Sequence, residues 1–113
     1  MVQVIDYRKT SINAVAFMED KKAEDILLFD LRGLTSFTDY MIIATVNSTP
    51  QMEAVIQELK NGLDIRVSHV EGPSGGGWAL MDYGGLVINI FYPKEREFYS
   101  LERIWGDAEK VST

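Results

Sequence analysis

Residues 78–91, WALMDYGGLVINIF, decide the fold of this chain, because they predict two β-strands joined by a glycine pair. The Gly84-Gly85 pair favours a type I′ hairpin turn, which requires positive φ at both of its central residues. Side chains alternate between the two faces of a strand. In the register that this turn sets, one face of the hairpin is apolar throughout and consists of Ala79, Met81, Tyr83, Leu86, Ile88 and Ile90. We expect this face to belong to the hydrophobic core.

The opposite face of the predicted hairpin mixes aromatic, aliphatic and polar side chains: Trp78, Leu80, Asp82, Val87, Asn89 and Phe91. Two large aromatic residues around an acid and an amide are typical of a surface that binds another protein. The alternative is that a helix covers this face and that its two polar residues are merely tolerated. The residues alone leave both interpretations open.

Further strands are predicted on the N-terminal side of the hairpin. Residues 26–31 and 40–45 are short apolar runs with the length of buried strands, and residues 66–70 can form a third strand. Residues 72–77 contain a proline and three consecutive glycines, and they predict a mobile loop.

Two helices are predicted before the hairpin. The first runs from about residue 9 to residue 21, where apolar residues recur at helical spacing. The second has clearer boundaries, because Ser48 and Gln51 fit a capping box and Pro50 suits the first turn. Asn61-Gly62 predicts a left-handed stop at its end.

A final helix is predicted to begin at Pro93, with Glu95 in its first turn, and to end at Gly106. Its predicted packing face consists of Phe98, Leu101, Ile104 and Trp105. Strands separated by helices and followed by a hairpin predict an α/β fold, a mixed β-sheet flanked by α-helices. A chain of 113 residues has room for one core, so we expect a single domain over residues 1–113, with a flexible tail at 109–113.

Composition narrows the function classes. Hydrophobic residues make up 46 % of the chain and charged residues 25 %, and both values are typical of a globular protein. The chain contains no cysteine, which excludes disulfides and thiolate metal sites. The net charge of −6 argues against direct nucleic-acid binding and favours a basic protein partner. We expect a cytoplasmic protein, since no apolar run resembles a signal peptide or a membrane span.

Catalysis is the main alternative to binding. Asp30, Asp39 and Asp82 lie near predicted strand ends, where carboxylates could gather magnesium for a nucleotide-handling enzyme. However, none of them belongs to a closely spaced carboxylate pair on one strand. His69 is the single histidine, so zinc sites built on two or three imidazoles are excluded. We expect no catalytic residues, no metal and no cofactor.

Two longer segments add a resemblance to a known family. Residues 78–91 followed by EREFYSLERIWGDA (95–108) resemble the C-terminal signature of the ribosomal silencing factor family, also called Iojap-like. Residues 21–51, KKAEDILLFDLRGLTSFTDYMIIATVNSTPQ, resemble the N-terminal signature of the same family. The two matches lie in the family's order and cover nearly the whole chain.

The resemblance implies a nucleotidyltransferase-like fold without a reaction. It implies binding to the large ribosomal subunit through ribosomal protein fourteen, where the bound protein sterically blocks joining of the small subunit and lowers translation when nutrients are short. Members of the family also take part in maturation of the large subunit in organelles. A separate alternative is a homodimerising adaptor whose mixed face pairs with itself. The predicted partner-binding residues are Trp78, Leu80, Asp82, Tyr83, Val87, Asn89, Phe91 and Glu95.

The chain departs from the family pattern at three positions. Family members commonly carry histidine at the position of Asn89, aspartate at that of Gly85 and glycine at that of Val46. Asn89 still offers a donor and an acceptor, although it lacks the pH sensitivity of a histidine.

Overall fold

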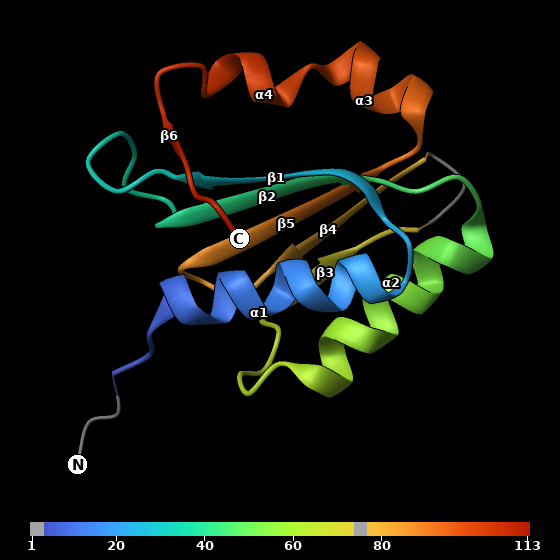
Figure 1. Ribbon diagram of the computed structural model, residues 1–113, viewed down its shortest axis with the longest axis horizontal. Helices are drawn as coiled ribbons and strands as arrows, with labels where there is room; N and C mark the ends of the chain where they lie inside the picture. The colour runs from blue at the N-terminus through green and yellow to red at the C-terminus, as the bar shows by residue number, and fades with distance from the viewer. Residues whose placement is uncertain (1–3, 74–76) are drawn as a thin grey trace.

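One mixed β-sheet organises the computed structural model, which describes residues 4–73 and 77–113 (Figure 1). Within these residues the sheet has six strands in the order β3-β4-β5-β2-β1-β6. Strands β2 and β5 are parallel, and all other neighbours are antiparallel. The strand bounds are β1 Glu24–Asp30, β2 Tyr40–Thr45, β3 His69–Glu71, β4 Trp78–Asp82, β5 Leu86–Phe91 and β6 Glu109–Lys110. The predicted single α/β domain with a mixed sheet is confirmed.

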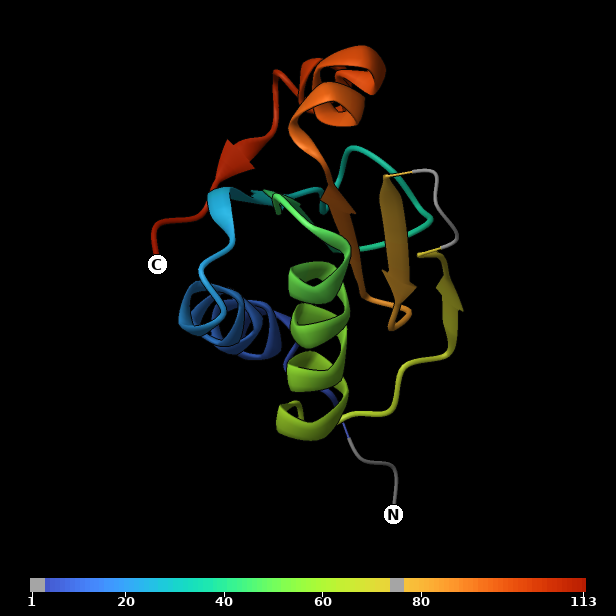
Figure 2. The same ribbon diagram turned by 90° about the vertical axis from the view of Figure 1, so that its right-hand side faces the viewer.

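Helices cover both faces of the sheet (Figures 1 and 2). Helices α1 (Tyr7–Asp20) and α2 (Thr49–Gly62) lie on one face, and the short helices α3 (Pro93–Tyr99) and α4 (Leu101–Ile104) lie on the other. The larger core cluster lies beneath α1 and α2, and a smaller one lies beneath the C-terminal segment, which contributes Leu101, Trp105 and Ala108. None of the helices in the described ranges is long and apolar enough to cross a membrane.

The predicted register of the hairpin is confirmed, but its turn type is wrong. Met81 pairs with Ile88 and Ala79 with Ile90, as the alternation of side chains requires. Gly84 has a φ of +93°, whereas Gly85 does not have positive φ, so the turn lacks the two left-handed residues of type I′. The ring of Tyr7 packs directly on Gly85, where a Cβ would overlap it.

Helix α2 begins as predicted, with the Ser48 hydroxyl accepting a hydrogen bond from the backbone N–H of Gln51 at 3.2 Å. The predicted left-handed stop at Gly62 is wrong, because Gly62 is the last helical residue and does not have positive φ. A Cβ on Gly62 would lie 2.7 Å from Cζ of Phe17, so this glycine instead allows α1 and α2 to approach closely.

The predicted final helix is interrupted. Ser100 adopts a left-handed conformation with a φ of +48° and divides the segment into α3 and α4. The break changes the helical phase, so Leu101 and Trp105 pack on the sheet while Phe98 and Ile104 are exposed. The predicted packing face is therefore right for two of its four residues.

Residues 109–111 pair with the sheet, although a flexible tail was expected over residues 109–113. Strand β6 pairs with β1, and the backbone N–H of Val111 donates to the carbonyl of Leu28 at 2.8 Å. Val111 also joins the larger core cluster. Strand β3 lies slightly later than the predicted 66–70, and part of the predicted 72–77 loop, residues 74–76, lies outside the described residues.

Candidate functional site

The mixed face of the hairpin is half covered by the C-terminal segment. Val87, Asn89 and Phe91 are buried, whereas Trp78, Leu80 and Asp82 are half-buried. The expectation of an open docking face is thus wrong for the β5 residues, because the α3–α4 segment folds back over them. The β4 residues remain partly accessible to a partner.

Trp78 is the centre of an aromatic cluster. Its ring stacks on Phe91 at a centroid distance of 5.5 Å and lies 5.2 Å from the ring of Tyr99. Its indole N–H donates a hydrogen bond of 3.0 Å to the side-chain oxygen of Asn89. The stacking on Phe91 and the hydrogen bond to Asn89 therefore fix the orientation of the Trp78 ring.

Helix α3 extends this cluster to the surface. Tyr99 is 45 % exposed and Phe98 is 82 % exposed, and their rings meet edge to face at 5.3 Å. We call Trp78, Phe98 and Tyr99 the aromatic patch. Sequence reasoning missed Tyr99 and assigned Phe98 to the core. The predicted spacing gave no signal for this, because adjacent residues of a helix can both be buried, as Val55 and Ile56 are in α2.

Asp82 and Glu95, the two acidic residues predicted to contact the partner, also contact other parts of this fold. A carboxylate oxygen of Asp82 accepts the backbone N–H of Gly84 at 2.8 Å and so closes the hairpin turn. Glu95 packs against Gly77, where an added Cβ would clash with its carboxylate. Both side chains are partly accessible. Glu95 lines a hollow with Phe98 and Tyr99, whereas Asp82 lies at the other end of β4 from Trp78, about 13 Å away.

Tyr83 lies on the other side of the sheet from the aromatic patch. It is buried in the larger core cluster, and its backbone carbonyl accepts a hydrogen bond from the Tyr7 hydroxyl at 3.1 Å. Within the part of the chain that the structure describes, its own hydroxyl has no hydrogen-bond partner. Burial raises the pKa of Tyr83 to about 12. The structure therefore does not bring Tyr83 to the predicted docking face.

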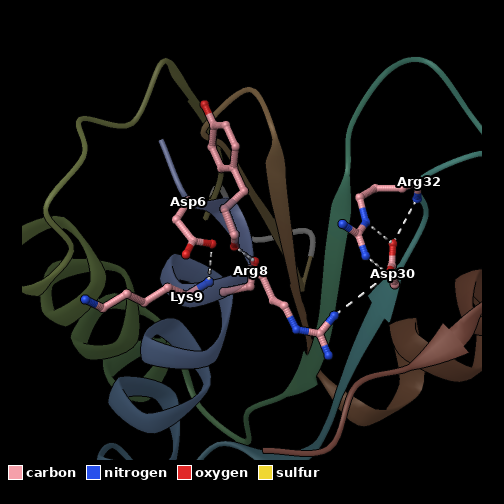
Figure 3. A network of polar contacts seen from close by, with 7 residues as sticks. Asp6, Arg8, Lys9, Asp30 and Arg32 are labelled. Atoms are coloured by element: carbon pink, nitrogen blue, oxygen red, sulfur yellow. Dashed lines mark hydrogen bonds and ion pairs between the residues drawn. The ribbon is translucent and has the colours of Figure 1, made fainter. Parts of the chain in front are cut away.

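The three aspartates considered for a metal site do not converge. The carboxylate of Asp30 is bound by the guanidinium of Arg32 at 2.7 and 3.0 Å, and Arg8 approaches it to 3.9 Å (Figure 3). These cations hold the pKa of Asp30 below its ordinary value, with the Arg32 hydrogen bonds as the main cause. Asp82 lies three strands away in the sheet, a distance of about 14 Å. No cluster of three potential metal ligands occurs among residues 4–73 and 77–113.

An aromatic patch beside accessible carboxylates, on a rigid sheet, is typical of a domain that binds another protein. Comparison with known proteins identifies the family. Residues 5–113 match the family model described as "Ribosomal silencing factor during starvation". This chain therefore belongs to the ribosomal silencing factor family.

Individual relatives cover most of the chain. It is 41 % identical over 98 residues to "Ribosomal silencing factor RsfS" of Bacillus subtilis (strain 168), an alignment that spans 84 % of this chain and 83 % of the relative. It is 30 % identical to mouse "Mitochondrial assembly of ribosomal large subunit protein 1", over 80 % of this chain and 42 % of that protein. A crystal structure of a Chromobacterium violaceum protein superimposes with a TM-score of 0.85 at 32 % identity, covering 96 % of this chain and 92 % of that one.

Proposed function

We propose that this protein binds the large ribosomal subunit through ribosomal protein fourteen of that subunit, and that the bound domain sterically blocks joining of the small subunit. The action is occupancy of a surface and requires no reaction or cofactor. In a cell it lowers translation when nutrients are short, and it takes place in the cytoplasm. Membership of the silencing factor family supports the general function, and the surface of the domain supports the mode of binding.

The observation that carries this proposal is the exposure of the aromatic patch. Aromatic side chains dominate the energetics of protein interfaces, because they bury a large area at a low cost in conformational entropy. Phe98 is a large apolar side chain, yet it is 82 % exposed. A partner that covers Phe98, Tyr99 and the accessible edge of Trp78 would remove this apolar surface from water.

Charge supports a basic partner at the same place. The chain carries a net charge of −6, the carboxylate of Glu95 lies beside Phe98 and Tyr99, and that of Asp82 lies at the other end of the same face of β4. Opposite charge at the rim of an interface accelerates association and makes it sensitive to salt. Leu80, which is half-buried two residues from Trp78 on the same face of β4, extends the apolar centre.

The deciding experiment is co-sedimentation of purified variants with large subunits, followed by binding to isolated ribosomal protein fourteen. Phe98→Ala should weaken binding by thirtyfold or more, about 2 kcal/mol, because a central interface aromatic is lost. Val4→Ala is the control, since Val4 is 89 % exposed and precedes α1 on the opposite face of the sheet. The proposal is wrong if Phe98→Ala and Val4→Ala bind alike.

Two further substitutions sharpen the test. Trp78→Ala removes an aromatic contact, but it also leaves the buried oxygen of Asn89 without its donor, so it affects folding as well as binding. Asp82→Asn is cleaner than Asp82→Ala, because the amide oxygen can still accept the Gly84 N–H while the charge is lost. Asp82→Asn should weaken binding mainly at low salt. Sedimentation of the free protein tests the alternative that the aromatic patch pairs two copies of this chain.

A role in assembly of the large subunit is the second candidate. The name of the mouse relative, which refers to assembly of the mitochondrial large subunit, favours it. Silencing predicts that added protein reduces joining of mature, purified subunits. Assembly instead predicts that cells depleted of the protein accumulate large-subunit precursors while mature subunits join normally in its presence.

A further inference from the structure

Helix α3 presents two of the three residues of the aromatic patch, yet it has no buried residue of its own. The contact of this seven-residue helix with the smaller core cluster is the ring of Tyr99, which packs on Trp78 and Phe91. Ser100 follows it in a left-handed conformation, so α3 is also not continued by a longer helix. A second contact, which is polar, joins α3 to the sheet.

Arg96 supplies that contact. Its side chain is only 11 % exposed and leaves α3 toward the sheet. One terminal nitrogen donates to the backbone carbonyl of Asp25 at 2.6 Å and to the hydroxyl of Thr45 at 2.8 Å. The remaining nitrogens donate to the carboxylate of Glu102 in α4 at 3.1 and 3.4 Å. One guanidinium thus joins β1, β2, α3 and α4, a task that suits its planar fork of donors.

The first strand is shaped to receive this guanidinium. Asp25 has a φ of +49°, which is uncommon for a residue with a side chain. The pairing of β1 with β2 shifts at this place, between Glu24 and Leu27. Strained residues of this kind persist where the surrounding contacts hold them, and they often serve a site. Here the irregular position contains Asp25, whose backbone carbonyl accepts the hydrogen bond from Arg96.

Arg96 and Tyr99 are three residues apart, so both lie on the side of α3 that faces the sheet, whereas Phe98 points away from it. With Pro93, Glu97 and Ser100, Arg96 lines an open groove of about 590 Å³, whereas Phe98 and Tyr99 line a second hollow together with Lys94, Glu95 and Glu97. Within the described residues, none of the hydrogen bonds of the Arg96 side chain goes to a residue of the patch. Its polar contacts act on the patch through the placement of α3.

We propose that Arg96 is a positioning residue for the docking face, a role that rests on the proposed function. It holds α3 at the distance and rotation at which Tyr99 packs against Trp78. Without it, α3 loses its polar attachment to the sheet while both core clusters keep their side chains. The docking surface then loses its shape without loss of any residue that touches the partner.

The test compares Arg96→Gln with Arg103→Gln as a matched control. Arg103 lines the same groove, but its side chain makes no hydrogen bond or ion pair to any residue of the described ranges. Protein labelled with 5-fluorotryptophan gives one ¹⁹F resonance for each of its two tryptophans, and Trp105→Phe assigns them. Arg96→Gln should shift or broaden the Trp78 resonance, and Arg103→Gln should leave it unchanged.

Binding to large subunits is measured on the same variants. We expect Arg96→Gln to weaken binding at least about tenfold, and Arg103→Gln to bind like the parent protein. Arg96→Lys keeps the positive charge but lacks the planar guanidinium with its several donors. We therefore expect the chemical shift of Trp78 and the affinity for large subunits to lie between those of the parent protein and of Arg96→Gln. It also replaces the glutamine variant if that variant does not fold in a thermal melt.

The outcomes separate the inference from the proposed function. An unchanged Trp78 resonance in Arg96→Gln overturns the positioning role, as does parent-like binding when Phe98→Ala binds weakly. If Phe98→Ala binds like the parent, the proposed function fails. A shifted resonance in Arg96→Gln would then still establish that Arg96 positions α3.

Discussion

The indole N–H of Trp78 donates a 3.0 Å hydrogen bond to the side-chain oxygen of Asn89, which is 1 % exposed. Replacing Asn89 by alanine removes the acceptor and leaves the indole N–H of Trp78 without a partner, which costs free energy. We therefore expect Asn89→Ala to lower the free energy of unfolding by about 1–3 kcal/mol. Chemical denaturation measures this loss. In a double-mutant cycle, Trp78→Phe and Asn89→Ala should be non-additive, and additive losses would contradict a stabilising hydrogen bond.

Tyr83→Phe should not destabilise the protein. The Tyr83 hydroxyl is buried and has no partner within the described residues, so the tyrosine carries a desolvation cost that phenylalanine lacks. We expect the variant to unfold at the same denaturant concentration or higher, with a gain of up to about 1–3 kcal/mol. A loss of stability would show that the hydroxyl makes a stabilising contact.

The same residue predicts a dependence on alkaline pH. Burial raises the pKa of Tyr83 to about 12, whereas an unfolded chain ionises its tyrosines near a pKa of about 10. The folded state therefore holds this proton more tightly, and the associated stability is lost as the pH rises from about 10 toward 12. Denaturation curves at pH 8 and pH 11 should show a smaller loss for Tyr83→Phe than for the parent.

For Asp30 we expect the opposite pH dependence: its contribution to stability is lost when the pH falls. Arg32 lowers the pKa of Asp30 below its ordinary value of 3.8, so the carboxylate stabilises the folded state above about pH 4 and ceases to do so as the pH falls further. Asp30→Asn should melt below the parent at pH 7, and the difference should shrink at pH 3. Asp64→Asn, at an exposed carboxylate, is the control and should change neither melt. A difference that persists at pH 3 would assign the effect to packing.

Gly85 and Tyr7 form a testable pair. A Cβ on Gly85 would overlap the Tyr7 ring, which also anchors its hydroxyl on the carbonyl of Tyr83. Gly85→Ala should therefore cost about 1–3 kcal/mol in the parent, as overpacked sites do. In a Tyr7→Ala background the same substitution should cost much less. Equal costs in both backgrounds would place the strain in the turn itself.

Several features of this fold follow from short stretches of sequence. Alternation of side chains and the Gly84-Gly85 pair predict the pairing of Met81 with Ile88, because a one-residue slip would expose the apolar face. Ser48 predicts the start of α2, since its hydroxyl accepts an N–H three residues later in the chain. The turn type was not predictable in the same way, because contact with Tyr7 from a distant helix also constrains Gly85.

The division of the mixed face into buried and accessible residues was decided only by the tertiary structure. Val87 and Phe91 are buried, and Trp78 is half-buried, because residues beyond Ser100 fold back across the sheet and end as strand β6 beside β1. That path depends on the left-handed Ser100 and on the guanidinium of Arg96. The guanidinium contacts Thr45 and Asp25, which precede it in the chain by 51 and 71 positions. Local periodicity reports which side chains share a face of a strand. It carries no information about what covers that face, because the covering segment is brought there by contacts between residues far apart in the sequence.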